Sequence, residues 1–416
     1  MQKRFSFSAN PSSVRAVMDA RKSDIAAGGL GTRDSGLRGT LSALCAILVG
    51  IGLARFAYTP LIPALVEAHW FAPSEAAYLG AANLAGYLAG ALAGRPLAAR
   101  IPVPALLRGT MLLASLSFLA CAAPLPFAWF FLWRFVSGFT GAVLMVVAAP
   151  AVLPHVVPKR RGLAGGAIFA AVGFGIAASG TLVPLLLRAG LPQTWIGLGA
   201  LSLLLTLIAW GGWPRERMRA AAPARAASRP DPKLKALYVE YALDAVGSVP
   251  HMVFLVDFIA RGLERGVAVG SWHWVLFGLG ASAGPVLAGF LGDRIGFGLA
   301  LRIAFAVKTL CVGWLALSGD AAALALSSVV VGAFLPGNVA LILGRVRELA
   351  RDEPEAQTGW TLATLAYAVG QAAAAYAMSF LFARTGSYAL LFGLAAGAIA
   401  AALAIDFLAA RLRASR

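Results

Sequence analysis

The sequence has few charged residues and, among them, few acidic ones. Asp, Glu, Lys and Arg make up 13% of the 416 residues, whereas soluble domains average about 25%. Hydrophobic residues make up 60%, and the mean hydropathy is +0.79. A composition this apolar is typical of a chain that lies mostly inside a lipid bilayer. We therefore expect no separate soluble catalytic domain.

The sequence also lacks the patterns that carry catalytic or metal chemistry. Its three cysteines, Cys45, Cys121 and Cys311, lie in apolar runs and are interpreted as packing residues rather than as a set of disulfides. No metal-ligand spacing, Cys–His pair, Ser-His-Asp order or Walker motif is visible. These absences predict no catalytic residue, no metal site and no bound cofactor.

Long polar stretches are scarce. Only residues 1–38 and 213–235 are polar over enough length to lie fully outside the membrane. The first stretch has no apolar core of a signal peptide, so we expect a disordered cytoplasmic tail. Because Met18 also begins a plausible chain, a shorter tail is the alternative. The second stretch is expected to be a cytoplasmic linker.

Between these stretches the sequence consists of apolar runs separated by polar or Pro-containing breaks. Crossing the hydrocarbon core takes about 20 apolar residues. The runs predict an all-α membrane protein with about twelve transmembrane helices, near 40–66, 77–99, 104–123, 127–151, 162–188, 193–212, 237–260, 270–292, 298–317, 321–344, 358–383 and 387–409.

Basic residues are distributed unevenly between the two sides of these spans. With both termini placed in the cytoplasm, 28 of the 35 Lys and Arg residues fall on the cytoplasmic side, four on the opposite side and three within spans. This excess predicts an even number of spans with both ends inside, in a bacterial inner (plasma) membrane. It also explains the net charge of +17 without a nucleic-acid partner.

Two short sequence matches indicate an internal repeat. Residues 88–95 (LAGALAGR) resemble residues 287–294 (LAGFLGDR) at an offset of 199, and Ala-Val-Gly at 171–173 recurs at 368–370 at an offset of 197. Two matches at nearly one offset predict two parallel six-helix halves, 39–212 and 236–416, joined by the linker 213–235.

With this length and repeat, the chain resembles the major facilitator superfamily over about residues 40–410. Residues 289–296 (GFLGDRIG) look like the G-x-x-x-D-R-x-G loop motif of that superfamily. A narrower resemblance is to the YbfB/YjiJ-type bacterial permeases, carried by residues 52–63 (GLARFAYTPLIP), 83–88 (NLAGYL), 134–138 (RFVSG) and 280–285 (GASAGP). The resemblance implies a permease and leaves its solute unspecified.

The loop motif supplies candidate gating residues. Asp293 is expected to cap a helix end or to pair with a neighbouring arginine, beside Arg294 and Gly289. In the first half the counterparts are Gly90 and Arg95, and there the Asp is missing. We therefore expect the charge contact of the superfamily only after the span near 270–292.

Glycines spaced four apart give a second gating hypothesis. Gly86, Gly90 and Gly94 share one helix face and let another helix approach closely. They serve either plain packing or a sliding contact between moving halves. The same two alternatives apply to Gly173 and Gly175.

Ionisable side chains within spans are the main candidates for function, because a charge in the membrane costs about 3 kcal/mol or more. Arg55, Arg134 and Asp244 lie on spans that, by the resemblance, line the central cavity of the superfamily. Lys308 lies on a span that is usually peripheral, where a neutral or snorkelling lysine is the alternative. Glu240 is expected in solvent at the cytoplasmic lip.

Charge and depth suggest roles for three of these residues. Counting helical rise puts Arg55 and Arg134 nearly level, with Asp244 closer to the cytoplasm. Two guanidinium groups that face one cavity suit an anion, so we predict a substrate with a carboxylate or similar group. The alternative is that one arginine points into the helix bundle and bonds backbone carbonyls. Asp244 is the hypothetical proton carrier.

Other polar residues complete the candidate substrate site. Tyr58, Gln371 and Asn338 could orient a ligand, although helix packing explains them equally well. His251, which follows Pro250, is interpreted as a satisfied structural histidine.

The sequence thus predicts a secondary active transporter of a small solute, coupled to protons and working by alternating access. We expect a monomer in the lipid bilayer and no enzyme activity. The alternatives are a non-transporting membrane receptor or assembly partner on the same scaffold, and an intramembrane enzyme.

Overall fold

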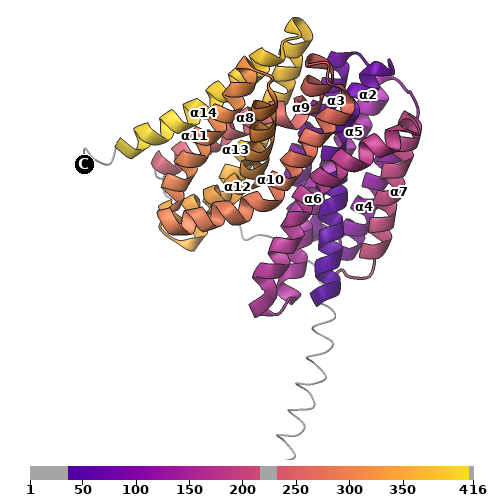
Figure 1. Cartoon of the computed structure of the whole chain (residues 1–416). Coiled ribbons are helices and arrows are strands. Elements are labelled where there is room, and N and C mark those ends of the chain that lie inside the picture. Colours follow the sequence, from indigo (N-terminus) through magenta and orange to yellow (C-terminus); the bar gives the residue numbers. More distant parts are fainter. Residues whose placement is uncertain (1–35, 216–231, 412–416) are drawn as a thin grey trace, which may run out of the picture.

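The computed structural model describes residues 36–215 and 232–411, and every regular element within these ranges is a helix. Most of the predicted tail (1–38) and linker (213–235) lies outside the described residues. Figure 1 shows the helices as two groups, violet to magenta for the first half and orange to yellow for the second.

The first group holds six apolar helical segments. The first runs over Gly36–Glu67 and contains the π-helix η1 (Leu48–Leu53), the 3₁₀-helix η2 (Phe56–Leu61) and α2 (Ile62–Glu67). The others are α3 (Pro73–Arg100), α4 (Val103–Leu119), α5 (Phe127–Val152), α6 (Arg161–Leu187) and α7 (Leu191–Ala209), with short 3₁₀ turns η3 (Leu153–His155) and η4 (Pro158–Arg160) before α6.

The second group also holds six segments. Its first segment is bent and consists of α8 (Pro232–Val253), α9 (Leu255–Asp257) and the π-helix η5 (Phe258–Gly262). The others are α10 (Gly266–Ile295), α11 (Phe297–Leu317), α12 (Ala321–Leu349), α13 (Glu353–Thr385) and α14 (Tyr388–Arg411). We call the end at which α7 ends and α8 begins the linker side.

The number of apolar segments agrees with the expected architecture. In the part of the chain that the structure describes, 10 helices are long and apolar enough to cross a membrane, and the bent pair of α8 and the segment after it makes 11. The helix α4 is apolar but shorter, at 17 residues, because it ends at Leu119 rather than near 123. The all-α membrane fold predicted from the sequence is confirmed.

Two spans that were expected to be continuous are interrupted. The first changes from π to 3₁₀ geometry around Ala54 and Arg55, and Pro60 lies inside the 3₁₀ part. The second bends by 45° after Val253, three residues beyond Pro250. Helices kink where prolines and π-bulges disturb the backbone ladder, and such breaks free carbonyl groups for other partners.

Within each half, two helices approach closely at glycines. A Cβ atom at Gly138 of α5 would overlap the carbonyl oxygen of Asn83 in α3, and one at Gly86 would overlap that of Phe135. The second half repeats this arrangement, since Gly284 of α10 lies against the carbonyl of Ala333 in α12. Small residues allow such contacts between membrane helices.

The two halves meet along α6 and α10. Gly173 lies against Ser282, Gly278 against Ala177, and Gly180 against Val275. Toward the linker side the same helix faces separate: no atom lies within 4 Å of a Cβ built at Gly166 or at Gly289. The halves therefore touch at the end opposite the linker side and part toward it.

Candidate functional site

A cavity lies where the two halves meet, with an empty volume of about 280 Å³. Both arginines singled out from the sequence line it, together with residues of η2, α3 and α8. The lining residues are Arg55, Phe56, Tyr58, Thr59, Gly80, Asn83, Leu84, Arg134, Met252 and Val253.

The cavity is built around the break in the first span. Because the helix geometry changes there, the carbonyl of Ala54 is available to other groups. It accepts hydrogen bonds from Asn83 Nδ2 at 3.3 Å, Arg134 Nη1 at 3.1 Å and Ser137 Oγ at 2.7 Å. The broken backbone thus positions Arg134 and ties α3 and α5 to the first span.

Arg134 is almost fully buried, with 2% of its surface exposed. Its guanidinium carbon lies 4.2 Å from the ring centroid of Tyr58, in cation–π geometry. Tyr58 in turn donates to the carbonyl of Ala76 at 2.8 Å. Arg134 also donates to the carbonyl of Ala54. The alternative that one arginine points into the helix bundle and bonds a backbone carbonyl therefore applies to Arg134, although this residue also lines the cavity.

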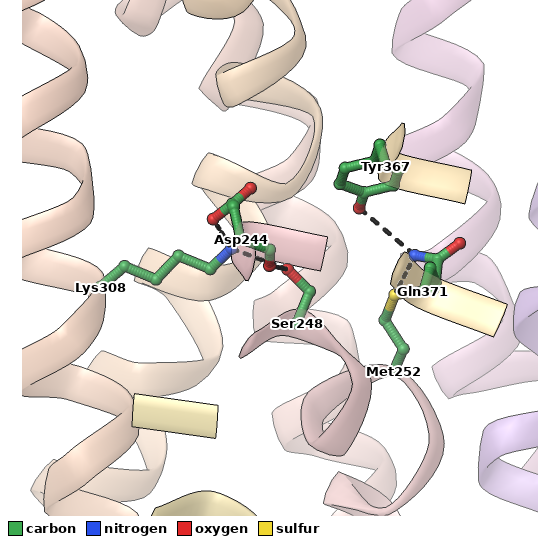
Figure 2. Close-up of polar contacts among 6 residues, drawn as sticks. All are labelled: Asp244, Ser248, Met252, Lys308, Tyr367 and Gln371. Carbon is green, nitrogen blue, oxygen red and sulfur yellow. Dashed lines mark hydrogen bonds and ion pairs between the residues drawn. The ribbon is translucent and has the colours of Figure 1, made fainter. Parts of the chain in front are cut away.

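Arg55 reaches across to the other half. Its Nη2 donates to Gln371 Oε1 of α13 at 2.6 Å, and its guanidinium carbon lies 4.4 Å from the ring centroid of Tyr87. Gln371 Nε2 lies 3.3 Å from the hydroxyl of Tyr367 and 3.2 Å from Sδ of Met252 (Figure 2). The predicted residues Arg55 and Gln371 are therefore in direct contact.

Part of the donor capacity of the two arginines is unused. Nε of Arg55 and both Nε and Nη2 of Arg134 are buried and find no hydrogen-bond partner within residues 36–215 and 232–411. In the same described ranges neither arginine forms an ion pair. The buried Arg134 and the partly buried Arg55 thus line, with spare N–H groups, a cavity that has no acidic residue in its wall, an arrangement that favours a negatively charged ligand.

Asp244 does not line this cavity. Its Oδ1 lies 2.6 Å from Nζ of Lys308 in α11, and Nζ also donates to Ser248 Oγ at 2.7 Å (Figure 2). Both charged side chains are buried, with 1% and 0% of their surface exposed. The alternative of a snorkelling Lys308 is wrong, because this lysine is buried and has a carboxylate as its partner.

Glu240 is not at a solvated lip. Only 2% of its surface is exposed, since α14, α12 and α11 cover that face of α8. It lines a second cavity together with Arg345 and Asp406. The sequence expectation of a solvent-exposed Glu240 is therefore wrong.

Two other candidates lie away from the arginine cavity. Asn338 of α12 is fully buried, and neither atom of its amide has a partner among the described residues. His251 Nε2 contacts Ser327 Oγ at 2.8 Å, and the ring packs against Phe277 and Phe392. One ring nitrogen therefore has a partner, whereas Nδ1 is buried and has none among the described residues, so the interpretation as a satisfied histidine holds only in part.

The candidate gating residues have unequal surroundings. Asp293 at the end of α10 is exposed and, among the described residues, makes no hydrogen bond or ion pair. Arg294 stacks on Phe290 at 4.6 Å, and Arg95 is exposed. A role of Asp293 in gating stays a prediction.

The candidate glycines differ in whether they face their own half or the other half, which distinguishes plain packing from a contact between the halves. A Cβ at Gly90 would overlap the carbonyl of Phe139 in the same half, so its surroundings are those of packing rather than of a contact between halves. Gly173 faces Ser282 of the other half, and Gly289 has open space around it. Of these glycines, Gly173 thus faces the other half and Gly90 does not.

Sequence reasoning missed a polar cluster at the end opposite the linker side. Asp257 is buried and pairs with Arg261, whose Nε lies 2.5 Å from Oδ1, and Tyr388 donates to Oδ2 at 2.6 Å. The spacing of four between Asp257 and Arg261 is typical of an ion pair along one helix face and could have revealed it.

The sequence match decides the family. Residues 47–407 match a family described as "Uncharacterised MFS-type transporter YbfB". The chain belongs to the YbfB-type branch of the major facilitator superfamily. The search of curated proteins found no match to this chain.

A solved structure supports the major facilitator fold. It is titled "Crystal Structure of A Bacterial Homolog to Human Lysosomal Transporter, Spinster, in Inward-facing And Unoccupied Conformation". The two chains share 15% identity with a TM-score of 0.68, and the match covers 89% of this chain and 96% of that one. This YbfB-type protein is thus a multi-pass membrane transporter by family and fold.

Proposed function

We propose that the protein is a secondary active transporter that moves a small organic anion across the bacterial inner membrane by alternating access, with both termini in the cytoplasm. The observation that carries the substrate class is the cavity with Arg55 and Arg134. Three of their buried N–H groups have no partner among the described residues. A carboxylate or phosphate would satisfy such donors in pairs.

The position of the cavity supports alternating access. It lies between the halves, and Arg55 bonds Gln371 across them. An anion that binds Arg55 competes with that bond, so its binding changes a contact between the halves. A ligand shifts a conformational equilibrium only by such differential contacts.

The proton-coupled part of the proposal rests on Asp244. It is a buried carboxylate about two turns of α8 away from Met252, which lines the arginine cavity. A proton taken up by this carboxylate would break its ion pair with Lys308 and change the packing of α8 on α11. The Asp244–Lys308 pair would thus be a second site, besides the arginine cavity, whose charge differs between the protonated and the deprotonated transporter.

A thermal-shift screen of the purified full chain tests the substrate class. Monocarboxylates, dicarboxylates and phosphate esters are compared with their uncharged amides and alcohols. A ligand at 100 times its Kd adds about 2.7 kcal/mol of stability. We expect hits only among anions, and we expect Arg55→Lys and Arg134→Lys each to weaken binding about tenfold or more while the unliganded protein stays folded.

Arg188→Lys is the matched control, because Arg188 is exposed outside the cavity. Hits are then tested for uptake into proteoliposomes with and without a pH gradient. Binding without flux would favour a receptor on this scaffold. Hits restricted to neutral or cationic compounds would refute the anion site.

A further inference from the structure

A buried carboxyl group one helical turn from Asp244 has no role in the transport cycle described above. Glu240 and Asp244 lie four residues apart on α8, so they share one face of the helix at an axial separation of about 6 Å. Glu240 is 2% exposed, and its Oε2 has no hydrogen-bond partner in the part of the chain that the structure describes. An unsatisfied buried carboxyl group calls for an explanation.

Glu240 lines a cavity at the linker-side end of the second half, with an empty volume of about 260 Å³. The wall is formed by the first turns of α8 and the last turns of α12 and α14, which end at this side. Its residues are Lys233, Leu237, Glu240, Arg345, Leu349, Asp406, Ala409 and Ala410. The cavity therefore leads from the linker side to the carboxyl group.

The charged neighbours of Glu240 have partners of their own. From α11, Arg302 pairs with Asp406 of α14, and Arg345 of α12 pairs with Glu348 at 2.8 Å. Arg302, Arg345 and Asp406 act on Glu240 electrostatically without a hydrogen bond to it. Lys233, Arg302 and Arg345 make the cavity unfavourable for a metal cation, whereas a neutral, protonated carboxyl group fits it.

Beyond Glu240, on the same face of α8, lies the pair of Asp244 and Lys308. Tyr241 of α8 and Tyr367 of α13 lie against each other in this region, with ring centroids 4.5 Å apart and ring planes tilted by 39°. Asp244 is buried, with 1% of its side chain exposed. Glu240 lies one turn of α8 closer to the linker side, where it can pass a proton between that side and Asp244.

We propose that Glu240 is the residue through which protons enter and leave the Asp244–Lys308 pair from the linker side. In loading, the O–H bond of protonated Glu240 breaks and its proton forms a new O–H bond on the Asp244 carboxylate, while Lys308 keeps its ammonium charge. The Glu240 carboxylate then binds a proton from the solution at the linker side, which forms its O–H bond again and leaves that solution one proton poorer. This proposal rests on the proton-coupled transport proposed above and needs no knowledge of the substrate.

Carbodiimide labelling tests it, because dicyclohexylcarbodiimide reacts with protonated carboxyl groups in apolar surroundings. Membrane vesicles with the full chain are labelled while the pH is set separately on each face, and mass spectrometry identifies the modified residues. Gly289→Cys, at an open linker-side position, reports which face is the linker side through an impermeant maleimide.

We expect Glu240 to be labelled and its labelling to follow only the linker-side pH. Raising that pH by about two units should lower the labelling about tenfold or more, since each unit beyond the titration midpoint changes the protonated fraction about tenfold. Asp293, which is exposed, is the internal control and should stay unlabelled.

The route to Asp244 needs a second variant. In Lys308→Gln the Asp244 carboxyl loses its counter-ion, so it binds a proton more readily. The infrared carbonyl band of protonated Asp244 should respond to a linker-side pH jump within the mixing time, and adding Glu240→Gln should slow that response about tenfold or more. Glu240→Asp in the same background should restore the fast response.

Three outcomes would overturn the proposal: Glu240 unlabelled at any pH, labelling that follows the opposite face, or an equally fast response of Asp244 without the Glu240 carboxyl. None of these results depends on flux. A protein that labels as expected but transports nothing would instead refute the proposed transport.

Discussion

Nη2 of Arg55 in the first span donates a 2.6 Å hydrogen bond to Oε1 of Gln371 in α13. One cavity arginine is thereby held by an amide of the opposite half. Gln371 is held in turn by Tyr367 and Met252. The bond makes the occupancy of the cavity and the contact between the halves interdependent, because a ligand on Arg55 replaces this partner.

Changing Gln371 to a carboxylate should imitate a bound anion. In Gln371→Glu the hydrogen bond to Arg55 becomes an ion pair, and charge-assisted bonds are about twice as strong as neutral ones. The unliganded variant should therefore unfold at a higher temperature and bind an anion about tenfold more weakly. Gln371→Leu should instead lose about 1–3 kcal/mol of stability. Thermal unfolding and calorimetric titration measure both effects, and anion affinity equal to that of the parent in Gln371→Glu would contradict the competition.

The ion pair of Asp244 and Lys308 should be strongly coupled. Removing one partner leaves an unpaired charge in the bundle, which costs about 3–5 kcal/mol in buried pairs of soluble proteins. We expect Lys308→Met and Asp244→Asn each to lower thermal stability substantially, and the double variant to be more stable than either. A double-mutant cycle on purified protein measures the coupling energy. Additive losses would show that the two side chains do not depend on each other.

Asp244→Asn should abolish substrate accumulation driven by a pH gradient without abolishing substrate exchange. If Asp244 carries the coupled proton, the variant should still exchange substrate across proteoliposomes but should lose accumulation driven by a pH gradient. Glu67→Gln, which also removes an acidic charge but at an exposed site, is the control for accumulation. Full accumulation in Asp244→Asn would place the proton carrier elsewhere.

The sequence predicted the architecture well for a physical reason. Apolar runs of membrane length leave few alternatives to a helix, because backbone groups in lipid need internal partners. The break at Ala54 and Arg55 was not predicted, since no proline lies within four residues of it and the carbonyl acceptors become visible only in three dimensions. Its consequence, the hydrogen bond from Arg134 to the Ala54 carbonyl, was covered only by the alternative that one arginine bonds backbone carbonyls.

Lys308 could have been placed beside Asp244 if the helix starts had been known. It lies 11 residues after Phe297, where α11 begins, and Asp244 lies 12 residues after Pro232, where α8 begins. At 1.5 Å per residue the two side chains are about 17 and about 18 Å from the linker-side helix ends. Opposite charges at equal depth predict a pair. The usual peripheral position of that span in the superfamily was the weaker argument.

Close helix contacts within a half should be sensitive to a single methyl group. Gly138→Ala would force α5 away from the Asn83 carbonyl, and overpacking of this kind costs about 1–3 kcal/mol. Gly109→Ala is the matched control, since no atom lies within 4 Å of its Cβ position. We expect a clear fall in unfolding temperature for the first variant only. Equal stability of the two would mean that α3 and α5 can part without cost.

Alternating access requires that the linker side can close, and the positions of two glycines make this measurable. On α6, Gly166 lies seven residues before Gly173, and on α10, Gly289 lies seven residues after Ser282, so both continue the helix faces that touch further up. Both positions are open in the present conformation. Rocking the halves about the contact between Gly173 and Ser282 would bring them together.

We therefore expect the double variant Gly166→Cys/Gly289→Cys to form a cross-link with a short bifunctional maleimide only in molecules whose linker side has closed. Cysteines at these open positions should not disturb folding, and each single variant controls for reaction with the buried native cysteines Cys45, Cys121 and Cys311.

An anion that stabilises the present conformation should lower the cross-linking rate, whereas one that promotes closure should raise it. Gel mobility measures the fraction cross-linked, and flux in proteoliposomes should fall in proportion to it. Complete cross-linking with unchanged flux would show that this movement is not part of transport. No cross-linking under any condition would show that α6 and α10 do not close at the linker side.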